Sequence, residues 1–160
     1  MLLNIQNVVK RYPGGDPDRP VLNGISLGLK AGETLALTGE SGCGKSTLLH
    51  LVGALDGFDS GEIHLDGLAL SLLDDSARAG LRRDKVALVF QQFNLIPSLT
   101  VAQNLAFHAR LAGHEDPDHI AFLTDQLGLT DHAHQYPEHL SGGQMQRVAI
   151  GRALAMRPKL

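Results

Sequence analysis

The 160-residue sequence is poor in several residue types, and each shortage excludes a class of protein. It has one cysteine, so no intramolecular disulfide can form, which favours a reducing compartment, the cytoplasm. Its net charge is only -3, which argues against nucleic acid as the main partner, because basic surfaces bind phosphate backbones. No stretch reaches the roughly 18 apolar residues of a membrane-spanning helix, and the start lacks the apolar block of a signal peptide. We therefore expect that action at a membrane would need another polypeptide.

What the sequence does contain is typical of a globular protein, with 43% hydrophobic and 19% charged residues. The pattern of apolar residues and turn residues predicts strands near 3–12, 21–29, 34–38, 62–65 and 86–90. Caps, glycines and prolines predict helices at 45–52, 101–111, 117–127 and 142–156. Strands come first and helices follow from about Phe93, so the order predicts an α/β sheet core with a helical subdomain.

A glycine-rich stretch follows the strand predicted at 34–38 and matches G-x-x-x-x-G-K-[ST]. Its glycines let backbone N–H groups point inward around a triphosphate, and the next helix adds the positive end of its dipole. We expect Lys45 to neutralise the β- and γ-phosphates, Ser46 to hold Mg²⁺, and Thr47 to assist. The alternative, a chance glycine-rich turn, does not account for the strand before the loop and the helix after it. The candidate ATP-binding residues here are Gly39, Glu40, Ser41, Gly42, Cys43, Gly44, Lys45, Ser46 and Thr47.

A second helix start carries the sequence Leu-Ser-Gly-Gly-Gln at residues 140–144. Ser141 and Gln144 form a capping box, and a helix N-terminus is an anion site. A capping box alone explains neither Gly142 nor Gly143. The stretch resembles the signature sequence of ATP-binding cassette (ABC) proteins, and residues 145–150 continue the resemblance.

The resemblance implies an ATP-binding subunit of an ABC transporter. In this family two subunits pair head to tail, and the phosphate loop of one and the signature of the other enclose each ATP. The chain is therefore expected to dimerise, as a homodimer or with a paired ABC ATPase subunit, and to bind an integral membrane permease subunit. It would lie peripherally on the inner face of the cell membrane. ATP binding and hydrolysis would drive transport or extraction of a substrate.

Two further positions match functional residues of the family. Gln91 matches the glutamine that contacts Mg²⁺ and the attacking water, with the adjacent Gln92 as the alternative. With Lys45, it is the predicted catalytic residue. Tyr12 matches the aromatic residue that stacks on adenine, and its alternative is a tyrosine that merely ends a strand beside a turn.

The resemblance covers the whole chain as a partial nucleotide-binding domain. It implies a β-rich core with the phosphate loop at 1–92, a helical subdomain at 93–140 and the signature helix at 141–160. The stretches 48–53 and 89–97 resemble the lipoprotein-release and macrolide-export branch. The family pattern continues with a Walker B strand ending in Asp-Glu and a later histidine, and neither is present before Leu160. We therefore expect a C-terminal truncation, with ATP bound but hydrolysed poorly by this chain alone.

Two other functions remain open at this point. A non-catalytic, ATP-dependent interaction module would bind nucleotide and a partner without turnover, which the missing Asp-Glu pair favours. A soluble cassette ATPase of DNA repair or translation is disfavoured by the acidic net charge.

Several remaining features receive simpler interpretations. His132 and His134 could suggest a metal site, but no cysteine lies near and the spacing is unlike that of zinc sites. We interpret the six histidines from His108 to His139 as lying on a solvated helical face. The apolar residues Phe93, Leu95, Ile96 and Leu99 form either local core or a docking groove for a helix of the membrane subunit.

Overall fold

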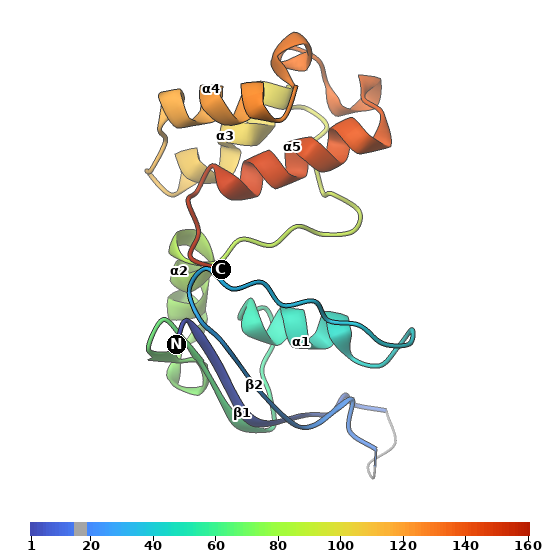
Figure 1. The fold of residues 1–160 in the computed structure, drawn as a ribbon, viewed down its shortest axis with the longest axis vertical. Coiled ribbons are helices and arrows are strands. Elements are labelled where there is room, and N and C mark those ends of the chain that lie inside the picture. The colour runs from blue at the N-terminus through green and yellow to red at the C-terminus, as the bar shows by residue number, and fades with distance from the viewer. Residues whose placement is uncertain (15–18) are drawn as a thin grey trace. The chain divides into compact units, whose positions relative to one another are not determined.

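The computed structural model describes residues 1–14 and 19–160, which form two compact units. One unit holds Met1–Arg82 and Lys159, and the other holds Arg83–Pro158 and Leu160. Figure 1 labels β1, β2 and α1 of the first unit and the helices α3, α4 and α5 of the second. The subdomain boundaries at 92 and 140 that the sequence suggests stay predictions.

The first unit contains a four-stranded antiparallel sheet in the order β2-β1-β3-β4. Its strands are β1 (Leu3–Lys10), β2 (Leu22–Leu29), β3 (Ser60–Leu65) and β4 (Leu68–Ala69). The predicted strands at 3–12, 21–29 and 62–65 are thus present, as is the N-terminal antiparallel part of the expected fold. A tight turn at Asp66 and Gly67, both with positive φ, joins β3 to β4, as the Asp-Gly pair predicts.

The central strand β1 carries an irregularity that a glycine on β3 accommodates. Its register with β2 shifts between Ile5 and Val8, and Asn7 lies in the left-handed region at φ 48. A Cβ on Gly61 would collide with the carbonyl oxygens of Gln6 and Asn7, so only glycine fits there. On either side of the irregularity Ile5 and Val8 are fully buried, which fixes the inward face of the sheet.

The helices of the first unit begin right after the glycine loop. Helix α1 spans Lys45–Val52, as predicted, and buries Leu48, Leu51 and Val52. A short 3-10 turn at Leu70–Leu72 leads to α2 (Asp75–Asp84), which crosses the boundary between the units and which the sequence pattern did not predict. The only buried residue of α2 is Leu81, so its sequence shows almost no helical periodicity of apolar residues.

The second unit packs three helices around two apolar clusters. They are α3 (Val101–Leu111), α4 (Pro117–Gln126) and α5 (Gly142–Leu154), with 3-10 turns at Thr130–His132 and Pro137–His139. Helices α3 and α5 contact each other most extensively. The larger cluster consists of Val101, Leu105, Leu129, Leu140 and Val148, and the smaller one of Ala109, Leu123 and Ala155. The bounds predicted for α3 are confirmed, and α4 and α5 end one and two residues earlier than predicted.

Two of the predicted strands are absent. Residues 34–38 and 86–90 form no strand, and Leu35, Val89 and Phe90 are exposed. The prediction was wrong because an apolar run becomes a strand only when a neighbouring strand supplies ladder partners. The second run makes a single parallel rung: Leu160 N–H donates to the Lys85 carbonyl, and Ala87 N–H donates to the Leu160 carbonyl.

Within residues 1–14 and 19–160, no helix combines the length and apolar character needed to cross a membrane.

Candidate nucleotide-binding site

The predicted phosphate loop is shaped by three glycines with positive φ. Gly39, Gly42 and Gly44 have φ values of 146, 80 and 92, which L side chains rarely adopt. Space also favours glycine at position 44, where a Cβ would lie 2.9 Å from the Val21 carbonyl oxygen, an atom of the backbone. A Cβ on Gly39 would lie 2.9 Å from the Cys43 sulfur. The loop closes on itself where Cys43 N–H donates to the Glu40 carbonyl at 3.4 Å.

The loop runs into a helix start that no side chain caps. Gly44 is the N-cap of α1 and supplies no side-chain hydrogen bond. Leu48 is the first residue of the helix whose N–H reaches a helix carbonyl, that of Gly44 at 2.9 Å. The N–H groups of the first turn and the positive end of the dipole therefore remain available to an anion.

Lys45 brings a positive charge to the same place. Its ammonium donates to the carbonyls of Gly39 (2.9 Å) and Glu40 (2.6 Å), and it lies 3.5 Å from the Cys43 sulfur. An ammonium has three N–H donors, and here all three point at loop atoms, the weakest contact being the one to the Cys43 sulfur. That donor is the one that a ligand can take over at least cost. Lys45 thus stiffens the loop that it would serve.

These residues surround a cavity of about 270 Å³. Val21, Ser41, Gly42, Gly44, Lys45, Ser46 and Thr47 line it. Ser46 is exposed in the first turn of α1, so its hydroxyl is accessible from the cavity side of the loop. A hydroxyl at this position is a hard oxygen ligand of the kind that Mg²⁺ accepts, so the residues present fit that ion. The strand expected before the loop is absent, whereas the helix after it is present.

Tyr12 lies just past the end of β1 in the same unit and is 40% exposed. Its hydroxyl donates to Asp56 Oδ2 at 3.0 Å, and the Lys10 ammonium lies 4.7 Å from the centre of its ring. Burial acts to raise the pKa of Asp56, but hydrogen bonds from Lys10, the Gly57 backbone and Tyr12 outweigh burial and lower that pKa from its ordinary value. The ring is therefore anchored to an ionised carboxylate at neutral pH.

The signature residues lie in the second unit, at the start of α5. Ser141 and Gln144 form both hydrogen bonds of the predicted capping box, at 3.3 and 2.7 Å. Gly142 and Gly143 are exposed, and a Cβ on either would meet nothing within 4 Å. Packing within the chain therefore does not require these two glycines.

Gln91 lies in the second unit, exposed in a tight turn that Phe93 N–H closes onto the Phe90 carbonyl at 2.9 Å. The segment after it is held by a buried arginine of α5. Arg152 is 6% exposed and donates to the carbonyls of Phe93 and Asn94, both at 2.8 Å. Burial lowers the pKa of Arg152 from its ordinary value. The guanidinium thereby ties the signature helix to the segment that carries Gln91.

A buried asparagine of α3 holds the next part of this segment. Asn104 is fully buried; its amide nitrogen donates to the carbonyls of Ile96, Leu99 and Thr100, and its amide oxygen accepts from Ile96 N–H at 2.9 Å. Leu95 packs against the larger apolar cluster of the second unit, which favours local core over a docking surface for that residue.

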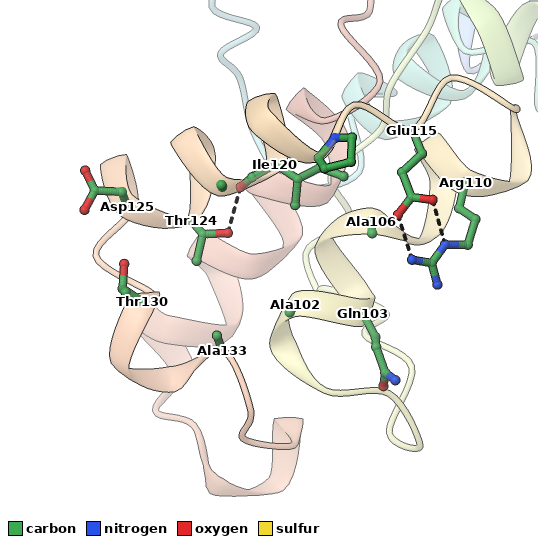
Figure 2. A pocket seen from close by; sticks show the side chains of 12 residues that line it. Ala102, Gln103, Ala106, Arg110, Glu115, Ile120, Thr124, Asp125, Thr130 and Ala133 are labelled. Atoms are coloured by element: carbon green, nitrogen blue, oxygen red, sulfur yellow. Dashed lines mark hydrogen bonds and ion pairs between the residues drawn. The ribbon is translucent and has the colours of Figure 1, made fainter.

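A larger cavity of about 500 Å³ lies between α3 and α4 (Figure 2). Short and apolar side chains such as Ala102, Ala106 and Ile120 line much of it. At one end Arg110 and Glu115 form an ion pair at 2.6 Å. Arg110 and Glu115 thus offset each other's charge, and Asp125 lines the cavity as a further acidic residue. The cavity contains none of the residues predicted to bind nucleotide, so the smaller loop cavity is the better candidate for ATP.

Sequence reasoning missed the residues that hold the predicted ones in place. Lys10 and Asp56 anchor Tyr12, and His132 contacts Gln144, with their Nε2 atoms 2.9 Å apart. The expectation of a solvated helical face is wrong for His108, His119 and His132, which are only partly exposed. These contacts join residues that lie 12 to 46 positions apart in the sequence, so no local sequence pattern predicts them.

The chain is similar to known ABC transporter proteins over almost its full length. The profile of the family described as "ABC transporter" matches residues 22–160. The chain is 44% identical to the macrolide export ATP-binding/permease protein MacB of Shigella flexneri over 96% of its residues. It is also 44% identical to the methionine import ATP-binding protein MetN of Caulobacter vibrioides over 99% of its residues. It spans 24% and 48% of the lengths of these two relatives.

Solved structures show the same likeness. A dimeric, post-hydrolysis structure of the ATP-binding cassette MJ0796, bound to ADP and Pi, superposes with a TM-score of 0.87 at 39% identity. The match covers 98% of this chain and 70% of that one. At this identity and score, the likeness extends beyond fold alone.

Proposed function

The chain belongs to the ABC transporter family, and on that premise we propose that it is the ATP-binding part of a transporter. In this role it couples ATP binding and hydrolysis to transport or extraction of a substrate at the cytoplasmic membrane. The observation that carries the proposal is the glycine loop, which combines an uncapped helix start, the Lys45 ammonium and a 270 Å³ cavity. Those are the groups that a triphosphate requires.

In the proposed complex the triphosphate lies against the loop and the first turn of α1. Backbone N–H groups of residues 42–47 point at phosphate oxygens, and Lys45 exchanges its long contact with the Cys43 sulfur for one with the β- and γ-phosphates. Ser46, with phosphate oxygens, would hold Mg²⁺, which when bound supplies positive charge that offsets the negative charge of the triphosphate. Gln91 is the proposed second Mg²⁺ contact and orients the attacking water, so it and Lys45 remain the proposed catalytic residues.

The base would stack on Tyr12, whose ring is partly exposed and anchored at its hydroxyl. Aromatic stacking on a base contributes about 1–3 kcal/mol in nucleic-acid complexes, so one tyrosine can matter for affinity.

The signature residues Ser141, Gly142, Gly143 and Gln144 are proposed to contact the ATP held by a second subunit. The exposed glycines and the capped helix start support this, because a second chain can approach them closely. The similar cassette MJ0796 is described as a dimer bound to ADP and Pi. A two-fold pair of chains gives two such sites at once.

We propose an integral membrane permease as the other partner, which places this chain peripherally on the inner face of the membrane. The relatives include an exporter with its own permease part and an ATP-binding protein of an importer, and they match equally well. The proposal therefore names the coupling role and leaves cargo and direction to the permease.

For these 160 residues assayed alone, we propose binding with slow turnover. The sequence has no apolar strand ending in Asp-Glu, the pair that the family resemblance assigns to Mg²⁺ and the attacking water.

The test is ATP binding and turnover on the purified 160-residue protein beside Lys45→Ala. We expect Lys45→Ala to weaken ATP binding about tenfold or more, because a hydrogen bond to a charged group is lost. Lys30→Ala, an exposed lysine on a turn outside the loop, is the matched control and should bind as the wild type does. Equal binding by Lys45→Ala would contradict the nucleotide site, and turnover well above that of Lys45→Ala would contradict the proposal of slow hydrolysis.

A further inference from the structure

Lys10 is a charged residue at the end of β1 that is almost fully buried, at 8% exposure. Its ammonium donates to Asp56 Oδ1 at 2.9 Å and to the Gly57 carbonyl at 2.7 Å. A buried ammonium is tolerated only when it is paired and hydrogen-bonded, and both conditions hold here. The Lys10–Asp56 pair is therefore a rigidly held part of the first unit.

Tyr12 contacts both members of the Lys10–Asp56 pair. Its hydroxyl donates to the other oxygen of the same carboxylate, Asp56 Oδ2, at 3.0 Å. The Lys10 ammonium lies over its ring, 4.7 Å from the centroid. Because the ammonium occupies one face of the ring, a flat base can stack only on the opposite face. The hydroxyl bond fixes the rotation of the ring, and the ammonium fixes which face is offered.

Asp56 also belongs to the segment that leaves the phosphate-loop helix. Only residues 53–55 separate it from the end of α1, and their N–H groups all donate back to α1 carbonyls at 2.9–3.0 Å. Further along, Asp59 makes two contacts at the end of β1. Its N–H donates to the Val9 carbonyl at 2.9 Å, and its carboxylate accepts from Arg11 N–H at 2.6 Å. The end of α1 and the end of β1 are thus held together by at least four polar contacts.

We propose that Asp56, held by Lys10, is the positioning residue that orients the Tyr12 ring to stack on a nucleotide base. It also keeps that ring at a fixed distance from the phosphate loop. The inference rests on the proposed function, in which ATP binds at that loop. Asp56 does not touch the ligand. It acts through Tyr12 and favours ligands that carry both a flat base and a triphosphate over ligands that carry the triphosphate alone.

The experiment measures affinities for Mg-ATP and for Mg-tripolyphosphate, which has the phosphates without the base. The variants are Tyr12→Phe, which keeps the ring and removes the hydroxyl bond, Asp56→Ala, their double mutant, and Tyr12→Ala. We expect Tyr12→Phe and Asp56→Ala each to weaken ATP binding about 3- to 10-fold, the usual effect of losing one such hydrogen bond. The double mutant should be no weaker than the weaker single variant, because both remove the same link. Tripolyphosphate affinity should stay within about twofold of wild type for all of them.

Other results would overturn the proposal in distinct ways. Wild-type ATP affinity in Tyr12→Phe together with weak binding in Tyr12→Ala would mean that the ring stacks without being positioned. Loss of tripolyphosphate binding in Asp56→Ala would mean that Asp56 supports the loop itself. Tyr12→Phe, the most conservative change, keeps the test valid if Asp56→Ala fails to fold. Failure of the proposed function looks different, since wild-type protein would then bind neither ligand, or Lys45→Ala would bind both.

Discussion

At the residue scale, the one cysteine of the chain lies inside the candidate site. Cys43 is exposed, and its sulfur is 3.5 Å from the Lys45 ammonium. We predict that alkylation of Cys43 blocks ATP binding, because the added group would fill space at the loop, and that saturating Mg-ATP slows alkylation. Mass spectrometry of N-ethylmaleimide labelling gives the rate at a single site. Cys43→Ser should bind ATP and resist the reagent, and a labelling rate unchanged by ATP would contradict the prediction.

A second residue-scale prediction concerns pH. Burial lowers the pKa of His108 from its ordinary value of 6.5, and the nearby charge of Arg152 lowers it further. The unfolded chain therefore binds a proton more readily than the folded chain does. The stability due to neutral His108 is complete above pH 6.5 and is lost as the pH falls from there through the lower, folded-state pKa. His108→Asn should flatten the pH dependence of the unfolding free energy below pH 6.5.

The control for this measurement is an exposed, uncharged residue of the same unit. Gln126→Asn removes no titrating group and should leave the pH dependence as it is in wild type. Urea titrations at several pH values measure both variants. The same pH dependence of the unfolding free energy in wild type and in His108→Asn would contradict the prediction, because His108 would then titrate alike in the folded and unfolded chains.

The capping box at Ser141 and Gln144 could be predicted from the sequence because its chemistry is local, and both of its hydrogen bonds are present. The roles of Tyr12 and Lys45 at a nucleotide stay predictions. The residues that support them could not be predicted in this way. Arg152 meets Phe93 across 59 positions, and Lys10 meets Asp56 across 46. Such pairs are set by how elements pack.

At the scale of elements, the same contrast between local motifs and contacts distant in sequence explains which predictions were confirmed. Helices α1 and α3 have the predicted bounds because a glycine loop and a capping box mark their starts. The strands at 34–38 and 86–90 were wrong because sequence shows that a run is apolar but does not show whether a neighbour pairs with it. Helix α2 was missed because it buries a single leucine, Leu81.

A prediction at this scale concerns two glycines inside helices. Gly151 of α5 faces α3: a Cβ there would collide with Leu105 and lie 2.8 Å from Leu127 Cδ1. Gly80 of α2 has open space around it. Alanine favours a helix by about 0.5–1 kcal/mol, so Gly80→Ala should stabilise the protein by that amount. Gly151→Ala should destabilise it by about 1–3 kcal/mol, because overpacking outweighs the helix preference.

Chemical denaturation of the two variants measures the contrast, with the signal followed by far-ultraviolet circular dichroism. A stabilised Gly151→Ala would mean that α3 and α5 can separate at little cost, which would contradict the tight packing at this point.

At the scale of the whole molecule, the chain consists of two compact units, one with the phosphate loop and one with the signature. If ATP bound only to the phosphate loop of a single chain, it would protect the first unit alone. In the proposed dimer, ATP also contacts residues 141–144 of the partner. We predict that Mg-ATP slows amide hydrogen exchange at residues 39–48 at any protein concentration and at residues 141–147 only at concentrations where the dimer forms.

Hydrogen exchange with mass spectrometry, at two protein concentrations and with Lys45→Ala beside wild type, measures this. Lys45→Ala should gain protection in neither region. Protection of 39–48 without any change at 141–147, even at high concentration, would contradict the sandwiched dimer while leaving the phosphate site intact.

The anchored ring of Tyr12 also gives the protein a built-in optical probe. The chain has no tryptophan and only two tyrosines, of which Tyr136 lies in the other unit. Near-ultraviolet emission therefore comes from these two phenols, and Tyr136→Phe would leave Tyr12 as the sole source. A base stacking on that ring would change its emission, so nucleotide occupancy could be followed in real time on the unlabelled protein.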